Sequence, residues 1–164
     1  MKEKKLFLID AYALIYRAYY AFIKNPRINS KGFDTSAIMG FFNSIFDIIK
    51  REKPDYFSVV FDKGGSTDRT KIFEDYKANR DSTPEPILDS VPIIHEILDA
   101  LGITSLQLSG YEADDVIGTV AKQAEKEGLI TYMVTPDKDF AQLVSKNIFL
   151  YKPARFGNGI EIWG

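Results

Sequence analysis

The sequence predicts an α/β fold, a three-layer sandwich with a mainly parallel central sheet. Three short apolar runs, at residues 5–10, 56–62 and 129–135, have the length and continuity of buried parallel strands. Segments of helical periodicity separate these runs, as right-handed crossovers between parallel strands require. With 164 residues, 45% of them hydrophobic, we expect one core and one domain covering residues 1–164.

The remaining elements follow from periodicity and from stop signals. Helices are predicted over residues 38–49, 93–101 and 112–128, and two further strands over residues 104–108 and 147–151. Lys53-Pro54 ends the first helix and Gly102 is the expected C-cap of the second. We also expect a helix directly after the first strand, carrying Arg17.

One segment, at about residues 63–85, lacks a core-forming pattern. Gly64-Gly65 opens it, and Pro84 and Pro86 close it. Long irregular segments in compact domains are usually functional or disordered. We interpret this one as a partly helical excursion over the active edge of the sheet.

The composition restricts the kinds of site that the chain can form. With no cysteine, neither disulfides nor a thiolate metal site is available, so any metal must be bound by oxygen. The N-terminal apolar run is too short for a signal peptide or a membrane span, so we expect a cytoplasmic protein without membrane contact. The net charge of −2 does not by itself indicate nucleic-acid binding.

Two other kinds of active site are disfavoured. The lone histidine, His95, lies among apolar residues of a predicted helix, and neither a cysteine nor a well-placed serine accompanies it. The sequence contains no glycine-rich phosphate loop of the Walker type, which disfavours nucleoside-triphosphate hydrolysis.

Acidic residues follow the predicted strands. Asp10, Asp62 and Asp137 come at or just after the three apolar runs. Because ligands bind outside the carboxyl ends of strands in open α/β sheets, we expect these side chains to converge. The remaining members of this acidic set are Glu112, Asp114 and Asp115 at a predicted helix start, and Asp139 shortly after Asp137.

Such a set needs compensating positive charge. Two unit charges about 4 Å apart repel by about 4 kcal/mol at an effective dielectric of about 20. Magnesium is a hard cation that is held by a few carboxylates together with substrate phosphates. Two such ions about 3.5–4 Å apart can activate a water and stabilise the leaving oxygen in phosphodiester cleavage. The acidic set therefore predicts two Mg²⁺ ions, with Mn²⁺ as an expected substitute.

The acids also have structural explanations. Ser109 and Glu112 fit a capping box, with the glutamate at the N3 position, and Asp137 is placed to cap a helix over residues 138–144. Capping does not explain why three strands all end at an acid, and we therefore favour the metal site.

A basic and aromatic face is predicted within the excursion. On a helix, Tyr76, Lys77 and Arg80 would share one side. Arginine and lysine bind phosphates, and an aromatic ring can stack on an unpaired base. Arg17, on the helix after Asp10, would face the same crevice. The alternative is an ordinary solvated helix with its tyrosine packed on the core.

Together these residues resemble the 5′-nuclease domain of bacterial DNA polymerases of type I, within the flap-endonuclease superfamily. The similarity covers almost the whole chain, and its most specific part is Gly110-Tyr-Glu-Ala-Asp-Asp-Val-Ile-Gly118. The other matching segments are Phe7–Asp10, Leu14–Ala18, Val60–Asp62, Phe73–Arg80 and Thr135–Asp139 with Gln142-Leu143. The resemblance implies a PIN-like, resolvase-like nuclease fold.

The resemblance also implies roles for individual residues. Asp10, Asp62, Glu112 and Asp114 would surround one ion, and Asp115, Asp137 and Asp139 the second. Tyr76, Lys77 and Arg80 would form the base of a helical arch that receives the 5′ strand, with Lys77 and Arg80 as catalytic residues positioning the scissile phosphate. Arg17 would contact a phosphate. The implied reaction is metal-dependent hydrolysis of DNA flaps or 5′ ends, including RNA primers in hybrids, during primer removal and repair in the bacterial cytosol.

Three other functions stay open at this point. One is a magnesium phosphatase or phospho-receiver that is phosphorylated on Asp10 or Asp62, although such phosphatases usually have a second aspartate where Tyr12 stands. The second is a catalytically silent DNA-binding module, and the third a toxin-like RNase. Since the family continues into a DNA-binding module and a polymerase, we expect the chain to be a fragment.

Overall fold

The computed structural model describes residues 3–61, 83–107, 112–153 and 160–164. Most of the predicted excursion at residues 63–85 lies outside these ranges. The elements, in chain order, are β1 (Lys5–Asp10), α1 (Ala11–Ala21), α2 (Ser36–Glu52), β2 (Tyr56–Val60), α4 (Glu85–Leu101), β3 (Thr104–Leu106), α5 (Ala113–Lys126), β4 (Ile130–Val134), the 3₁₀ helix η1 (Lys138–Leu143), β5 (Ile148–Lys152) and β6 (Glu161–Trp163).

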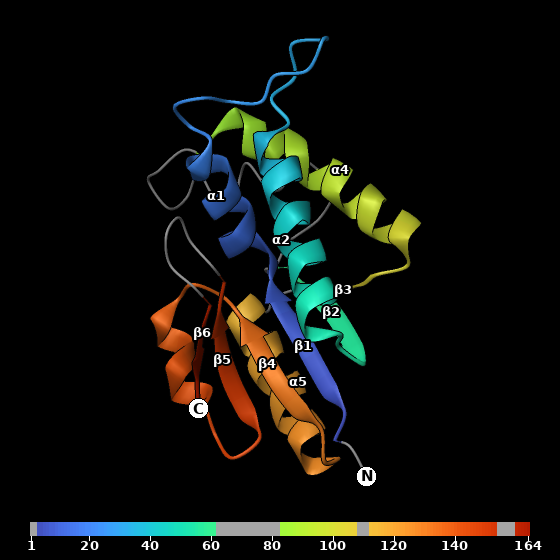
Figure 1. Ribbon diagram of the computed structural model, residues 1–164, viewed down its shortest axis with the longest axis vertical. Helices are drawn as coiled ribbons and strands as arrows, with labels where there is room; N and C mark the ends of the chain where they lie inside the picture. The colour runs from blue at the N-terminus through green and yellow to red at the C-terminus, as the bar shows by residue number, and fades with distance from the viewer. Residues whose placement is uncertain (1–2, 62–82, 108–111, 154–159) are drawn as a thin grey trace.

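Within the described ranges, six strands form one sheet in the order β3-β2-β1-β4-β5-β6. The first five strands along the chain are parallel, and β6 pairs with β5 in the antiparallel direction. From β1 the chain moves outward to β2 and β3, and then returns to the other side of β1 with β4 (Figure 1). The boundary between β1 and β4 is therefore the point where the strand order reverses, which is where open α/β sheets bind ligands.

Two apolar layers cover the two faces of the sheet. On one face, side chains of α1, α2 and α4 pack against β1 residues such as Phe7 and Ile9. On the other face, α5 and the 3₁₀ helix pack against residues such as Leu8 and Met133. Figure 1 shows α2 in front of the strands and α5 behind them. The predicted three-layer α/β sandwich is confirmed.

The helix boundaries show where local signals act. Helix α2 ends before Lys53, which has a left-handed φ of 48°, and Pro54 follows. Helix α4 ends at Gly102, whose φ of 73° makes it the predicted C-cap. Its start was predicted wrongly, because α4 begins at Glu85, ahead of the apolar stripe at 93–101. Pro86 sits in the first turn, where its missing N–H costs no helical hydrogen bond, so it opens the helix.

The sequence did not predict β6. This strand has only three residues and pairs at the antiparallel edge with β5, so it carries no apolar run of its own. None of the helices in the described part of the chain combines the length and the apolar character needed to cross a bilayer.

Candidate metal centre

Asp10 is the last residue of β1, in the middle of the sheet. Its neighbours on β2 and β4 are set by the parallel register, which pairs Asp10 with Val60 and Ile9 with Val134. The side chain is only 9% exposed, and it makes no capping bond to helix α1, which starts at the next residue. A carboxylate so far from water needs polar partners.

Thr135 supplies one of those partners. It follows β4 directly, is fully buried, and donates from Oγ1 to Asp10 Oδ2 at 2.9 Å. Thr135 Oγ1 also accepts a hydrogen bond from the backbone N–H of Asp137, at 3.1 Å. Thr135 therefore connects the acid at the end of β1 with the acidic turn after β4. The sequence did not mark Thr135 as a site residue; its only signal was a polar side chain at the end of an apolar strand.

The turn after β4 holds two exposed acids. Asp137 is the N-cap of the 3₁₀ helix η1, and its Oδ1 accepts the backbone N–H of Asp139 at 2.9 Å. The capping role predicted for Asp137 is thus confirmed, although the helix is of the 3₁₀ type and ends at Leu143. This bond uses only one oxygen of Asp137, so capping and metal binding are compatible.

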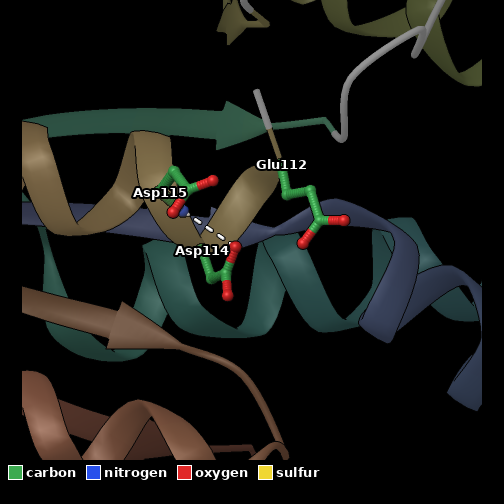
Figure 2. Close-up of side chains that lie close together, drawn as sticks. All are labelled: Glu112, Asp114 and Asp115. Carbon is green, nitrogen blue, oxygen red and sulfur yellow. Dashed lines mark hydrogen bonds between the residues drawn. The ribbon is translucent and has the colours of Figure 1, made fainter. Parts of the chain in front are cut away.

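Three further acids gather at the start of α5. One carboxylate oxygen from each of Glu112, Asp114 and Asp115 lies within 4.8 Å of the others, and all three side chains are exposed (Figure 2). The backbone N–H of Asp115 donates to Asp114 Oδ1 at 2.9 Å. The position at a helix N-terminus favours negative charge, but it does not remove the repulsion between neighbouring carboxylates.

The capping-box explanation of Glu112 is wrong. Glu112 occupies the N-cap position of α5 instead of N3, and its side chain makes no capping hydrogen bond. Its expected partner, Ser109, lies outside the described residues. One carboxylate oxygen of Glu112 nevertheless lies within 4.8 Å of an oxygen of Asp114 and of Asp115 (Figure 2).

A cleft of about 510 Å³ joins the two acidic groups. It is lined by Asp114 and Asp115 of α5 and by Asp137 and Asp139 of the turn after β4, together with Lys138, Phe140, Gln142 and Leu143. We call it the acidic cleft. Among the described side chains, no lysine or arginine forms an ion pair with any of these four carboxylates. Oxygen donors of this kind, clustered without a basic partner, suit hard divalent cations.

The other predicted site residues fall in two groups. Asp62, Tyr76, Lys77 and Arg80 lie outside the described residues. Arg17 is half-buried on α1, about 10 Å along the helix axis from Asp10, and does not line the acidic cleft. His95, which the sequence disfavoured as a catalytic base, packs its ring on Phe61 with 4.0 Å between the centroids.

Residues 5–162 match a family model described as the 5′-3′ exonuclease, N-terminal resolvase-like domain. The chain belongs to this family. It is 43% identical over 150 residues to a 5′-3′ exonuclease of Aquifex aeolicus, covering 92% of this chain and 51% of the relative. It is 45% identical over 149 residues to DNA polymerase I of Treponema pallidum, covering 90% of this chain and 15% of the relative. The chain thus spans about half of the first relative and a small part of the second.

Solved structures confirm the fold of this 5′-3′ exonuclease family member. The T5 D15 protein, co-crystallized with metal ions, superposes with a TM-score of 0.64 at 18% identity, covering 98% of this chain and 58% of that one. The catalytic core of Rad2, in complex with a DNA substrate, gives a TM-score of 0.56 at 21% identity, with 98% and 48% covered. The nuclease fold that the sequence resemblance implied is therefore confirmed.

Proposed function

We propose that this exonuclease-family domain hydrolyses DNA phosphodiester bonds at 5′ flaps and 5′ ends, using two divalent cations. The observation that carries the proposal is the acidic cleft, in which Asp114 and Asp115 of α5 face Asp137 and Asp139 of the turn after β4. Thr135 connects one of its acids, Asp137, to Asp10 at the β1–β4 boundary, which is the kind of position where open α/β sheets bind ligands.

The donor set fits the proposed ions. Magnesium is the proposed physiological cation and manganese its substitute, because both accept carboxylate oxygens. Asp10, Asp62, Glu112 and Asp114 would hold one ion, and Asp115, Asp137 and Asp139 the other. When bound, the ions stabilise the negative charge that develops on the phosphate during hydrolysis.

The chain's own residues then orient these ligands. Thr135 fixes Asp10 by a hydrogen bond and holds the backbone of Asp137. Lys77 and Arg80 are proposed to position the scissile phosphate, and Arg17 and Tyr76 to bind the DNA strand. An arginine or lysine near the leaving strand offsets phosphate charge that the carboxylates would otherwise repel.

In the cell, the proposed substrates are flaps and primer ends, RNA in RNA–DNA hybrids included, and the proposed place is the bacterial cytosol. A polymerase domain in the same full-length chain is the proposed partner, since the relative from Treponema pallidum is named DNA polymerase I. Such a partner would produce the displaced 5′ strand that this domain removes.

Cleavage of a labelled 5′-flap substrate tests the proposal. The wild type is expected to cut in Mg²⁺ or Mn²⁺ and to be inactive in EDTA, whereas Asp115→Asn should lose at least about a hundredfold in rate. Asp99→Asn is the matched control, because Asp99 is an exposed aspartate near the end of α4. Equal rates for Asp115→Asn and the wild type would refute the assignment.

The same preparation distinguishes the other functions. A silent DNA-binding module would bind the flap in Ca²⁺ and leave it intact in Mg²⁺ and Mn²⁺. A phospho-receiver would form an aspartyl phosphate with a small phosphodonor. An RNase would cut single-stranded RNA and leave the DNA flap.

A further inference from the structure

A second hollow lies along α5, next to the acidic cleft. We call it the α5 groove; its volume is about 700 Å³, and its α5 wall consists of Gly118, Thr119, Lys122, Gln123 and Lys126. It shares Asp114, Asp115 and Leu143 with the acidic cleft, so the two hollows lie next to each other. A ligand that passes out of the cleft on this side enters the groove.

The wall of the groove is one face of the helix. Thr119, Lys122, Gln123 and Lys126 follow one another at helical spacing, and all four are exposed. At a rise of about 1.5 Å per residue, Lys122 lies about 10 Å and Lys126 about 16 Å along the axis from Asp115. Gly118 leaves space at the bottom of the groove, because a side chain at this position would fill it and its Cβ atom would already contact Leu143 Cδ1 at 3.4 Å.

Both lysines are available for an external anion. Among the described residues, neither Lys122 nor Lys126 forms an ion pair. The acid between them in the sequence, Glu125, is held elsewhere: its Oε2 accepts Ser145 Oγ at 2.6 Å and the backbone N–H of Asn147 at 3.1 Å. The groove is therefore acidic only at the end that it shares with the acidic cleft, and basic along the rest of α5.

We propose that the α5 groove binds the sugar-phosphate backbone of the DNA strand next to the bond that is cut. This inference rests on the proposed function. Lys122 and Lys126 would each bind a phosphate, while Thr119 and Gln123 would donate hydrogen bonds to phosphate or sugar oxygens. The occupant is a nucleic-acid strand because the groove adjoins the acidic cleft, so a strand with one phosphate in the cleft would bring its next phosphates to the lysines.

The test measures binding without cleavage. The double variant Lys122→Ala/Lys126→Ala and the wild type are titrated with a fluorescent 5′-flap DNA in Ca²⁺, at several salt concentrations. The variant is expected to bind about tenfold more weakly at 0.1 M salt, and its plot of log Kd against log salt should be less steep by about 1 to 2. Restoring the charges in Lys122→Arg/Lys126→Arg should recover most of the affinity.

The matched control is Lys4→Ala/Lys50→Ala. These two lysines are also exposed, but Lys4 precedes the amino end of β1 and Lys50 lies in the last turn of α2, so the control removes the same charge away from the groove. Its affinity should stay within about twofold of the wild type, because distant surface charges are screened.

Three results would overturn the proposal. The groove variant, Lys122→Ala/Lys126→Ala, could keep the affinity of the wild type and its dependence on salt. The control, Lys4→Ala/Lys50→Ala, could lose as much affinity as the groove variant. The groove variant could also change only the oligomeric state, which would mark the groove as a contact between two copies of the chain. Failure of the wild type to cleave in Mg²⁺ would count against the proposed function. The binding measurements in Ca²⁺ would still show whether the α5 groove binds DNA.

Discussion

Thr135 and Asp10 are joined across the boundary between β1 and β4, with 2.9 Å between Thr135 Oγ1 and Asp10 Oδ2. The two residues are 125 positions apart in the sequence. Because the same hydroxyl oxygen accepts the N–H of Asp137, one buried side chain sets the relative position of two proposed metal ligands.

We predict that Thr135→Val lowers both stability and metal affinity. The valine keeps the shape but leaves the Asp10 carboxylate and the Asp137 N–H without this partner, which should cost about 1–3 kcal/mol of unfolding free energy. The Mg²⁺ concentration for half-maximal cleavage should rise roughly 10- to 100-fold, since residues that orient metal ligands have effects of this size. Urea unfolding and a Mg²⁺ titration of cleavage measure the two effects, and Thr135→Ser should recover both.

Thr131 is the control on the same strand. It is also fully buried, but its Oγ1 has no hydrogen-bond partner among the residues that the structure describes. Thr131→Val should therefore be neutral or slightly stabilising, because the valine removes a buried hydroxyl that makes no bond. A large loss of stability in Thr131→Val, equal to that of Thr135→Val, would show that the hydrogen bond to Asp10 is not the cause.

We predict that removing one carboxylate of the acidic cleft stabilises the metal-free protein. Asp115→Asn relieves repulsion from Asp114 and Glu112, whose oxygens lie within 4.8 Å, so its Tm in EDTA should exceed that of the wild type. In Mg²⁺ the order should reverse. A ligand at about ten times its Kd adds about 1.4 kcal/mol to the stability of the protein that binds it.

Thermal unfolding with and without 10 mM Mg²⁺ provides the measurement. Asp99→Asn, remote from the cleft on α4, should respond to Mg²⁺ as the wild type does. If Mg²⁺ raised the Tm of Asp115→Asn as much as that of the wild type, this carboxylate would not contribute to cation binding.

We predict that Gly40→Ala destabilises the contact between α1 and α2. A Cβ atom at Gly40 would lie 2.6 Å from Ala18 Cβ and 3.2 Å from Ala18 Cα, so the backbones of the two helices would have to separate. Overpacking of this kind costs about 1–3 kcal/mol. Gly118→Ala is the comparison, because a Cβ there meets Leu143 at an ordinary 3.4 Å and gains up to about 1 kcal/mol of helix propensity. Denaturant unfolding should place the two variants on opposite sides of the wild type.

We predict that Glu125 contributes stability only above acidic pH. The hydrogen bond from Ser145 is the main cause that lowers the pKa of Glu125 below its ordinary 4.5, and the N–H of Asn147 adds to it. A lowered pKa in the folded state stabilises the protein above the unfolded pKa, and this contribution is lost as the pH falls through the folded value. The Tm of the wild type should exceed that of Glu125→Gln at pH 7, and the difference should shrink on acidification below about pH 4.5.

Ser145→Ala isolates the cause of the pKa change. This variant removes the largest contribution to the lowered pKa while leaving the glutamate in place. Its Tm difference from the wild type should also shrink as the pH falls. A difference for either variant that stayed constant from pH 7 to pH 3 would mean that the carboxylate charge is not involved.

The sequence predicted those parts of the fold and site that depend on one segment at a time. The apolar run at 5–10 is β1 to the residue, and the acids of α5 and of the turn after β4 do share a cleft. The role of Thr135 could not be predicted, because it arises only when β4 pairs with β1. The α5 groove needs α5 beside Leu143, and the short edge strand β6 needs β5, so neither has a local signal.

Other predictions stay predictions. The roles of Asp62, Tyr76, Lys77 and Arg80 concern residues outside the described ranges. The capping box at Glu112 was wrong because a serine cap at 109 requires the helix to start at residue 110, whereas α5 starts three residues later, at Ala113.

The position of β1 between β2 and β4 affects the order in which the sheet can form during synthesis. On a ribosome, β1 emerges before the other strands of the sheet, yet its partner β4 follows only after about 120 more residues, which at 5–20 residues per second takes roughly 6 to 24 s. During that interval the backbone N–H and C=O groups of β1 have no strand to pair with on the β4 side, and such an open edge is prone to mispairing. The proposed metal ligand Asp10 therefore acquires its hydrogen bond from Thr135 late in synthesis, when β4 is inserted beside β1.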